Sequence, residues 1–391
     1  ERILSATVAM KADAIHPGFG FLSENARFAE LCEKCGITFV GPPSKVIRML
    51  GNKKIARSTM IAAGVPVVPG SEGDVEDIET GLKEAERIGY PVIIKAALGG
   101  GGKGMRVANT PEEFPEAYAT ARKESEIAFG DGTMYIEHFV VNPRHIEFQI
   151  LADSFGNVIH LGERDCSIQR NHQKMIEESP SAAVSSELRE KMGHAAVTAA
   201  KAAGYVNAGT IEFLLEPDGK FWFMEMNTRI QVEHPVTEWV TGIDLVKEQL
   251  KIASGMPLEI SQEDVRIQGH AIECRINAEN PQKNFRPSPG TIQGAHFPGG
   301  NGIRVDTCVY NGCKIPPYYD SMLAKLIVHA GNRKEAIAKM QSALGEVIID
   351  GIDTNIDYQY EILKDEDYQS GNFDTGFLAS HIIAGVKINE N

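Results

Sequence analysis

The spacing of apolar positions predicts alternating helices and strands at the start of the chain. Apolar residues that recur every three or four positions indicate helices, whereas short alternating or continuous apolar runs indicate strands. By these criteria we expect a helix over residues 3–10, a strand over 13–16, a helix over 23–35, a strand over 38–40 and a helix over 52–63. Helices and strands in this order predict part of a parallel α/β sheet.

The pattern over residues 68–139 indicates a small separate module. We expect in it a helix over 77–88, a strand over 91–96, a glycine-rich loop, a strand over 105–107, a helix over 112–124 and a strand over 134–139. Residues 140–260 are mostly extended, with helices over 186–203 and near 245–254. The rest contains a strand over 266–276, proline- and glycine-rich turns, and a helix over 333–344. Alternation along that strand predicts one face with Ala271, Glu273 and Arg275 and another with Ile272, Cys274 and Ile276.

Composition narrows the classes of function. A chain of 391 residues exceeds what one hydrophobic core usually supports, so two or three domains are expected. The 53 acidic against 39 basic residues argue against a nucleic-acid surface, and an anionic substrate must be met by a local basic pocket. No run of about 18 or more apolar residues is present, so no segment is predicted to span a membrane.

The cysteines do not form a metal-binding pattern. Only Cys32 and Cys35 are spaced as a CxxC pair, and no second pair follows. Both lie in a predicted helix, where we expect them to pack. All six cysteines fit reduced thiols in a cytoplasmic enzyme.

A glycine-rich segment over residues 99–104 follows an apolar strand. Glycines let a backbone approach phosphate oxygens closely. A dinucleotide-binding motif would require a helix next, but Met105 begins a strand; a Walker A motif would require Ser or Thr after Lys103, where Gly104 stands. We expect a flap between antiparallel strands, and a plain mobile turn is the alternative.

Two lysines are candidates for binding phosphate. Lys95 lies inside an otherwise apolar strand, where an unpaired ammonium group is costly, so an anionic partner is expected. Nucleotide phosphates would supply that partner. Lys53, at the start of a helix, is a second candidate, with a solvated surface lysine as the alternative.

The segment 209–227 predicts an acidic β-hairpin around the turn sequence Glu-Pro-Asp-Gly. Side chains alternate between the two faces of a strand, so Glu225 and Asn227 point the same way, and the neighbouring strand can place Glu212 beside them. Carboxylates gathered among aromatic residues repel one another unless a cation joins them. An all-oxygen site suits magnesium or manganese; a solvated acidic face is the alternative.

Polar residues flank this hairpin on both sides. Arg229 has the planar fork that binds an oxyanion, and Glu233, four residues on, can act as a base. His234 precedes a proline and is as well explained by a structural role. Upstream, alternation puts His145, Glu147 and Gln149 on one face of a strand. We expect residues 163–174 to form a long polar loop, a kind of segment that often carries function.

These motifs together resemble those of biotin carboxylases. The resemblance rests on HPGFGFLSEN (16–25), GGGGKGM (99–105), ERDCSIQRNHQK (163–174), MEMNTRIQVEHPVTE (224–238) and GHAIECRINAE (269–279), and it covers essentially the whole chain. The closing segment, with its residues 319–322 and 350–355, looks most like the free-standing subunit of bacterial acetyl-CoA carboxylase. One departure is Phe19, which stands where a tyrosine is common, so any hydroxyl contact to biotin there is absent.

The resemblance implies a mixed α/β (α+β) fold of the ATP-grasp type. It divides the chain into a partial N-terminal α/β domain (1–50), an ATP-grasp domain (51–260) whose mobile lid covers about 68–139, and a C-terminal biotin carboxylase domain (261–391). We expect the opening strands of the usual N-terminal domain to be missing. No biotinyl-domain motif occurs, so we expect the chain to act on a separate carrier.

The resemblance also implies roles for individual residues. Triphosphate binding falls to Lys53, Lys95, Gly101 and Gly102; adenine binding to Glu137, His138, Phe139 and Val140; other nucleotide contacts to His145, Gln169 and His172; metal binding to Glu212, Glu225 and Asn227; bicarbonate binding to Lys174, Arg229 and Val232; the general base to Glu233; and stabilisation of the biotin enolate to Arg275.

The implied activity is ATP- and bicarbonate-dependent carboxylation of biotin on a carrier protein, through carboxyphosphate, as the first half-reaction of acetyl-CoA carboxylase in fatty acid synthesis. A role in a pyruvate or other acyl-CoA carboxylase is the alternative. The implied cofactors are ATP, two Mg²⁺ or Mn²⁺ ions, and carrier-bound biotin. The implied partners are the carrier protein, the carboxyltransferase and, in the full-length form, a second copy of the chain; nucleic acid and membrane are not expected partners.

Two other classes compete with this interpretation. Another ATP-grasp ligase, which makes an acyl phosphate for attack by an amine, would carry similar ATP-binding residues. A regulatory protein with an inactive site is the non-enzyme alternative, although every acid and arginine of the motifs is present.

Overall fold

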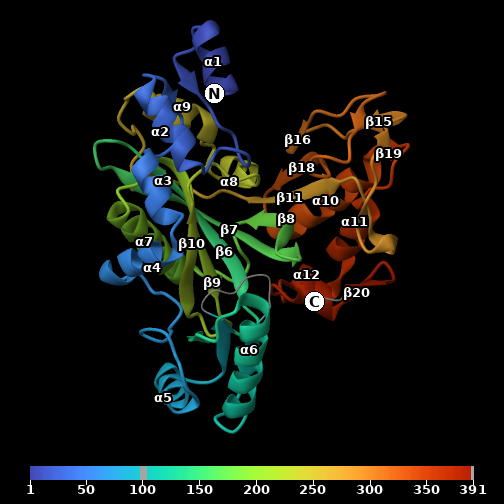
Figure 1. The fold of residues 1–391 in the computed structure, drawn as a ribbon. Helices are drawn as coiled ribbons and strands as arrows, with labels where there is room; N and C mark the ends of the chain where they lie inside the picture. Colours follow the sequence, from blue (N-terminus) through green and yellow to red (C-terminus); the bar gives the residue numbers. More distant parts are fainter. Residues whose placement is uncertain (97–103, 389–391) are drawn as a thin grey trace. The chain divides into compact units, whose positions relative to one another are not determined.

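The computed structural model describes residues 1–96 and 104–388 (Figure 1). The chain divides into two compact units, each described here by itself. A large unit, which we call the sheet unit, comprises Glu1–Val65, Arg144–Leu215 and Phe223–Asn391; the other, which we call the small unit, comprises Pro66–Pro143 and Glu216–Trp222. Among the described residues, no helix has both the length and the apolar character needed to cross a membrane.

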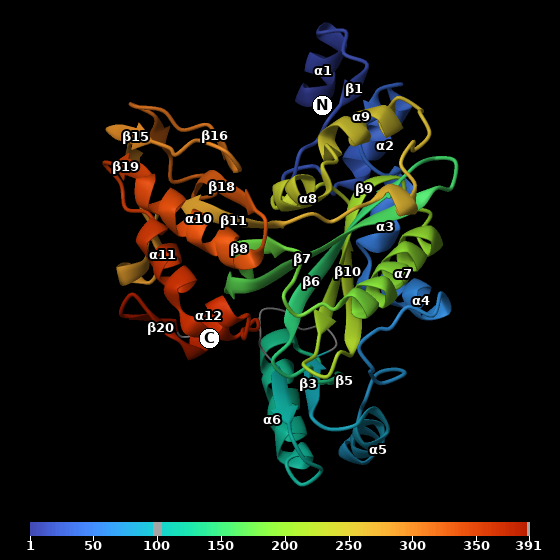
Figure 2. The same ribbon diagram turned by 180° about the vertical axis from the view of Figure 1, so that it is seen from behind.

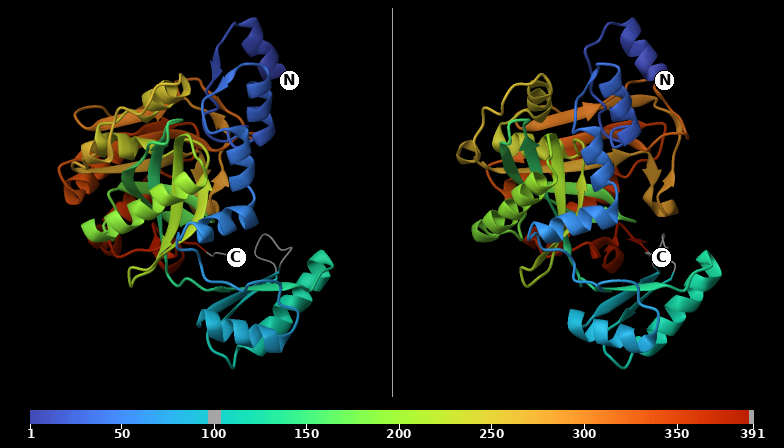
Figure 3. Two further views of the ribbon diagram at one scale, coloured as in Figure 1. Left: turned by 90° about the vertical axis from the view of Figure 1, so that its left-hand side faces the viewer. Right: turned by 60° about the vertical axis from the view of Figure 1, so that its left-hand side comes forward.

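The small unit is built on a three-stranded antiparallel sheet in the order β4-β3-β5. Its elements are β3 (Val92–Ala96), β4 (Met105–Ala108), β5 (Met134–His138), α5 (Ile78–Ile88) and α6 (Phe114–Phe129). Val92, Ile94 and Ala96 alternate along β3 and are buried, and Val92 and Ile94 form an apolar core with Phe114 of α6, between the sheet and the helices (Figure 3).

The sheet unit is organised around one long sheet whose strands come from distant parts of the sequence. Across the sheet they are β10 (Phe221–Asn227), β9 (Asn207–Leu215), β6 (Arg144–Ala152), β7 (Val158–Arg170), β8 (Gln173–Ser179), β11 (His270–Asn277), β18 (Met322–Ala330) and β16 (Ile303–Thr307). The ladders from β9 through β6, β7, β8, β11 and β18 to β16 are all antiparallel.

Several helices of the sheet unit begin at residues whose side chains cap them. Asn25, Asn52, Ser185, Asp244 and Asn332 each accept a hydrogen bond from a backbone N–H of the first turn, which satisfies a donor that has no partner inside the helix. The helices are α1 (Arg2–Ala9), α2 (Ala26–Lys34), α3 (Ser44–Leu50), α4 (Lys53–Ala62), α7 (Ser186–Ala202), α8 (His234–Thr241), α9 (Leu245–Ala253), α10 (Arg333–Glu346), α11 (Ile356–Lys364), α12 (Glu366–Ser370) and α13 (Phe377–Ser380).

The two faces of β11 meet different helices. Ile272, Cys274 and Ile276 belong to an apolar core with residues of α10 and α11, which lie against this part of the sheet in Figures 1 and 2. Ala271, on the other face, packs with Val236 and Val240 of α8. The alternation expected along this strand is therefore confirmed, and α8 covers the face that also carries Glu273 and Arg275.

Short paired strands complete the sheet unit. The parallel pair β1 (Ala14–Ile15) and β2 (Thr38–Phe39) confirms the parallel arrangement predicted for the start of the chain. The remaining pairs are β12 (Glu279–Asn280) with β13 (Arg286–Pro287), β14 (Gly290–Thr291) with β17 (Lys314–Ile315), β15 (Gly294–His296) with β19 (Ile348–Asp350), and β20 (Ile382–Ile383) with β21 (Val386–Lys387).

The prediction of a long polar loop over residues 163–174 is wrong. This segment is the end of β7, a two-residue turn and the start of β8. Asn171 and His172, at the turn, both have positive φ (48° and 61°), as the tight hairpin turns that match strand twist require. Many polar residues in succession favour a loop, but here they pair with one another inside the sheet.

The prediction that both CxxC cysteines pack in a helix is half right. Cys32 is buried in α2, whereas Cys35 lies just after the helix and is exposed. All six cysteines are free thiols.

Candidate active site

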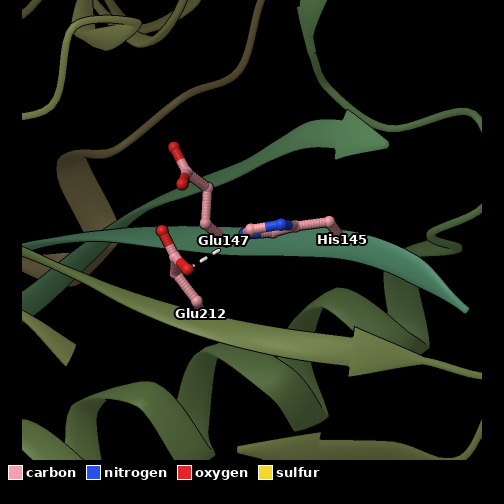
Figure 4. Close-up of side chains that lie close together, drawn as sticks. All are labelled: His145, Glu147 and Glu212. Atoms are coloured by element: carbon pink, nitrogen blue, oxygen red, sulfur yellow. Dashed lines mark ion pairs between the residues drawn. The ribbon is translucent and has the colours of Figure 1, made fainter. Parts of the chain in front are cut away.

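The polar centre of the sheet unit is assembled by strand register. Glu147 on β6 lies directly opposite Glu212 on β9 and opposite Arg164 on β7. Figure 4 shows Glu147 and Glu212 side by side with His145, whose Nε2 is 3.1 Å from Glu212 Oε2. Residues opposite one another in a ladder have neighbouring side chains, so strands far apart in sequence bring these charges together.

Lys174, at the start of β8, is the centre of this cluster. Its Nζ donates hydrogen bonds to Glu147 Oε2 at 2.6 Å, to Glu233 Oε1 at 2.7 Å and to Glu212 Oε1 at 3.1 Å. The side chain is 12% exposed and each of the three carboxylates is buried. One ammonium group thus partly offsets three carboxylates in a site from which water is largely excluded.

Arg164 neutralises the other side of Glu147. Its guanidinium is fully buried, forms an ion pair with Glu147 and donates to Gln149 Oε1 at 2.8 Å and to Thr237 Oγ1 at 2.9 Å. A buried charge is stable only when it is paired and its hydrogen bonds are satisfied, and both conditions hold here.

Glu233, which immediately precedes α8, is held between two cations. One carboxylate oxygen accepts from Lys174 and the other accepts from Arg275 Nη2 at 2.9 Å. Burial alone would raise the pKa of Glu233, but the charges of Lys174, Arg275 and Arg164 outweigh it and hold that pKa well below its usual range. This lowered pKa favours the ionised form of Glu233.

Arg275 is largely buried and pairs with two carboxylates, those of Glu177 and Glu233. Its Nε donates to Glu177 Oε1 at 2.6 Å. These partners replace the ordinary surface salt bridge that an arginine on the polar face of a strand would otherwise form.

The three residues predicted to bind metal lie on β9 and β10. Asn227 Nδ2 donates to Glu212 Oε1 at 2.9 Å, so these two side chains are in contact. Glu225 is exposed, yet partial desolvation by surrounding protein and the charge of Glu212 raise its pKa, while Lys53 opposes the shift. A hydrogen bond thus links the Glu212 carboxylate to the Asn227 amide, and the charges of Glu212 and Glu225 act on one another.

This oxygen-rich group fits a hard divalent cation. A cation would relieve the repulsion between the carboxylates of Glu212 and Glu225, and carboxylate and amide oxygens are its preferred ligands. The nearby group of His145, Glu147 and Glu212, whose potential ligand atoms lie within 4.8 Å of one another, is a poorer metal site because Lys174 already contacts two of its carboxylates.

Arg229 lies beside the same group. Its guanidinium donates to Gln231 Oε1 at 2.6 Å, to Glu24 Oε2 at 2.9 Å and to Asn227 Oδ1 at 3.1 Å. Gln231 also donates to Glu212 Oε1 at 3.2 Å. Arg229 is thus connected to the predicted metal ligands, whereas no direct contact joins it to Lys174 or Glu233 among the described residues.

The other residues predicted to bind substrates are placed as follows. Lys53 is exposed at the first turn of α4, near enough for its charge to act on Glu225. Gln169 is buried opposite Lys174 in the β7–β8 ladder, and His172 is exposed in the turn. The backbone carbonyl of Val232 accepts a hydrogen bond from Lys325 Nζ at 2.8 Å.

In the small unit, Lys95 forms an ion pair with Glu137, which lies on the neighbouring strand β5. The anionic partner expected for Lys95 is thus a protein side chain in this structure. His138 and Phe139 donate backbone hydrogen bonds to Pro69 and Pro91, both at 2.8 Å, and Val140 follows them. Gly101 and Gly102 lie outside the described residues.

Several contributors to the cluster have no role assigned from the sequence, among them Glu24, Glu147, Arg164, Glu177 and Gln231. Glu147 was placed on the correct face of its strand, and a period-two polar pattern in a buried strand was its signal. Glu177 gave no such signal, because it stands beside Glu178 in a stretch whose strand pairing was not anticipated.

Three family models match successive parts of the chain. The family model for the biotin carboxylase N-terminal domain matches residues 1–47, that for the ATP-binding domain of the carbamoyl-phosphate synthase L chain matches 52–261, and that for the biotin carboxylase C-terminal domain matches 273–380.

Similar proteins share about half of their residues with this chain. Biotin carboxylase 1 of Bacillus subtilis is 57% identical over 98% of this chain and 85% of its own length. The small subunit of 2-oxoglutarate carboxylase from Hydrogenobacter thermophilus is 51% identical over 97% and 81%. The crystal structure of the biotin carboxylase domain dimer of that organism's 2-oxoglutarate carboxylase, in complex with MgADP, ADP and bicarbonate, is 51% identical with a TM-score of 0.85 and covers 97% of this chain and 84% of that chain.

The fold and the ATP-binding domain define an ATP-dependent ligase with an ATP-grasp fold. More narrowly, the chain belongs to the biotin carboxylase family, whose members join bicarbonate to biotin with ATP. The resemblance seen in the sequence motifs is thereby confirmed.

Proposed function

We propose that the cluster around Lys174 is where this chain activates bicarbonate and carboxylates biotin. The observation that carries the proposal is the position of Glu233, whose two carboxylate oxygens face Lys174 and Arg275 at 2.7 and 2.9 Å. An anionic substrate is attracted to these two cations. A carboxylate between them is placed to take its proton.

The proposed first step is removal of the bicarbonate proton by Glu233 while Lys174 and Arg229 hold the anion. Hydrogen bonds from Lys174 to bicarbonate would replace part of those to Glu233, which raises the basicity of that carboxylate. An oxygen of the deprotonated anion then attacks the γ-phosphorus of ATP, ADP leaves, and carboxyphosphate forms. Donors that are already in place stabilise the developing charge without reorganisation.

The proposed second step is carboxylation of biotin. Carboxyphosphate breaks down to CO₂ and phosphate, and the phosphate takes the proton of the biotin ureido nitrogen. The negative charge then resides on the ureido oxygen, where the guanidinium of Arg275 stabilises it. The nitrogen attacks CO₂ and gives carboxybiotin.

Glu212, Glu225 and Asn227 are the residues that would hold Mg²⁺ or Mn²⁺. When bound, the metal neutralises phosphate charge during transfer. The structure with MgADP and bicarbonate in the Hydrogenobacter thermophilus relative supports this cofactor set. Within the sheet unit, we assign Lys53, His145, Gln169, His172 and the backbone of Val232 to substrate binding, and within the small unit Lys95, Gly101, Gly102 and residues 137–140.

We assign acetyl-CoA as the final acceptor of the carboxyl group, on the basis of the sequence resemblance described above. The partners are then a carrier protein and a carboxyltransferase of fatty acid synthesis. A second candidate is a pyruvate or 2-oxoglutarate carboxylase, because relatives with those names are 53% and 51% identical to this chain, nearly as similar as Biotin carboxylase 1 at 57%. Supply of each acceptor to the chain reconstituted with its carrier and transferase would separate the two.

The domain division at residues 50 and 260, the lid over about 68–139, a homodimeric full-length form and a cytoplasmic location belong to the same proposal. The dimer in the Hydrogenobacter thermophilus structure supports the second copy. The free cysteines support a reducing compartment.

The experiment that tests the activity is release of ADP from ATP with bicarbonate and free biotin supplied together or singly. We expect rapid ADP release only when both are present. Biotin-independent release stimulated by an amine acceptor would instead identify the chain as another kind of ATP-grasp ligase.

A further inference from the structure

Two buried carboxyl groups lie behind Arg275 and have no part in the steps above. Antiparallel pairing of β8 with β11 puts Glu177 directly opposite Glu273. Both side chains are fully buried on the sheet face that α8 covers. Neighbouring acids in a ladder repel one another when both are ionised.

The hydrogen bonds of this pair are unequal. Glu177 Oε1 accepts from Arg275 Nε at 2.6 Å, while Glu177 Oε2 has no partner within the described chain. Neither oxygen of Glu273 has a hydrogen-bond partner among the same residues. An ionised carboxylate with no hydrogen bonds is among the least stable groups in a protein interior.

Four charged side chains from different parts of the sheet unit act on Glu273. They are Glu177 from β8, Arg275 from β11 itself, Lys325 from β18 and Glu233 at the start of α8. Lys325 is engaged elsewhere, with the Val232 carbonyl at 2.8 Å and Asp306 at 3.2 Å. Burial raises the pKa of Glu273 well above its usual range. Burial also raises the pKa of Glu177, and the charge of Arg275 opposes that shift.

We propose that Glu177 is a positioning residue that orients Arg275 for the biotin half-reaction, and that Glu273 is an uncharged carboxylic acid that leaves Glu177 free to pair with Arg275. This inference rests on the role of Arg275 in the proposed function. Glu177 holds the Nε edge of the guanidinium, so a terminal nitrogen is directed toward Glu233. Without Glu177, nothing on β8 fixes the rotation of the side chain.

The geometry explains why both members of the pair are acids. A guanidinium between two carboxylates, Glu177 and Glu233, is held by charge-assisted hydrogen bonds on both sides, and such bonds are roughly twice as strong as neutral ones. A second ionised acid at position 273 would add charge without a partner. As a neutral acid, Glu273 fills the space opposite Glu177 without competing for Arg275.

The test compares two rates in each variant: carboxybiotin formation from free biotin, and bicarbonate-dependent ADP release without biotin. We expect Glu177→Ala to lower the ratio of the first rate to the second on the order of 10- to 100-fold, which is the range for loss of a hydrogen bond to a charged group. Glu177→Gln keeps an acceptor oxygen but no charge, so the ratio should fall about 3- to 10-fold.

Glu178→Gln is the matched control. Glu178 is the next residue on β8, is also buried, and pairs on the opposite face with Arg333 at 2.9 Å and His270 at 3.2 Å. Its replacement disturbs the same strand without touching Arg275, so the ratio should stay at the wild-type value. If Glu177→Ala does not fold, the comparison of Glu177→Gln with Glu178→Gln still decides.

Arg275→Ala separates failure of this inference from failure of the proposed function. If Arg275→Ala lowers the ratio but both Glu177 variants behave like Glu178→Gln, the positioning role is overturned while the role of Arg275 stands. If Arg275→Ala leaves the ratio unchanged, both are overturned.

The protonation of Glu273 has a direct readout that a purely structural role would not move. The infrared difference spectrum between wild type and Glu273→Gln, recorded at neutral pH, should contain the carbonyl stretch of a protonated carboxylic acid. A difference spectrum that contains only ionised-carboxylate bands would refute the uncharged state.

Discussion

Replacement of Lys174 by methionine removes a side chain that contacts three buried carboxylates. The methionine side chain has nearly the same length and no charge. Glu147, Glu212 and Glu233 each lose a hydrogen bond of 2.6 to 3.1 Å. Glu147 keeps Arg164, Glu233 keeps Arg275, and Glu212 keeps His145. We expect the free energy of unfolding to fall by about 3–5 kcal/mol at neutral pH, the range for removing one partner of a buried ion pair.

The pH dependence of this loss follows from the carboxylate pKa values. Burial alone would raise the pKa values of Glu233 and Glu212. Lys174 and other neighbouring cations outweigh burial, so both pKa values are lowered in the folded protein. A lowered pKa stabilises the fold above the unfolded value of about 4.5, and that stabilisation is lost as the pH falls through the folded pKa. Below about pH 4.5, the difference between wild type and Lys174→Met should therefore shrink.

Urea unfolding at pH 7 and near pH 4 measures this difference. Trp239, in α8 of the sheet unit, reports on the relevant unit when Trp222 is replaced by phenylalanine in every variant. Lys191→Met is the control, because Lys191 pairs with Glu187 on the exposed surface of α7 and its loss should change stability little at either pH. A loss in Lys174→Met that is no larger than in the control, or that grows toward low pH, would refute the reasoning.

Three further predictions address the chemistry and the small unit. Glu225→Gln should raise the magnesium concentration needed for half-maximal activity and lower turnover by orders of magnitude; an unchanged magnesium titration would remove Glu225 from the metal site. Arg275→Ala should lose most carboxybiotin formation, by about 10²–10³ in rate, yet keep much of the biotin-independent ATP cleavage, whereas Glu233→Gln should lose both; equal losses in the two assays would contradict the division of roles. Hydrogen exchange with and without ATP should show protection concentrated over residues 68–139; protection spread evenly over the chain would count against a lid.

The sequence was most informative where alternation and turn signals coincide. The hairpin formed by β9 and β10 was predicted from its turn and from the spacing of Glu225 and Asn227, and the two faces of β11 were predicted from strict alternation. These patterns reflect local rules: side chains alternate on strands, and turns need particular residues.

The sequence was least informative where polar residues satisfy one another inside the sheet. The β7–β8 hairpin is predicted as a loop because its many charged and polar residues are typical of a solvent-exposed segment. The cluster could not be assembled from the sequence either, since Lys174 reaches Glu147 and Glu233, which lie 27 and 59 positions away. Such contacts depend on strand order and register, which a single sequence does not specify.

The central claim is that bicarbonate attacks ATP and passes through carboxyphosphate in this chain. Bicarbonate labelled with ¹⁸O tests it most directly, with ATP and biotin present and the released phosphate analysed by mass spectrometry. One bicarbonate oxygen should be transferred to each phosphate. The oxygen that bridges carbon and phosphorus in carboxyphosphate comes from bicarbonate, and it stays on phosphorus when its bond to carbon breaks. Phosphate that carries no label while carboxybiotin accumulates would contradict the account.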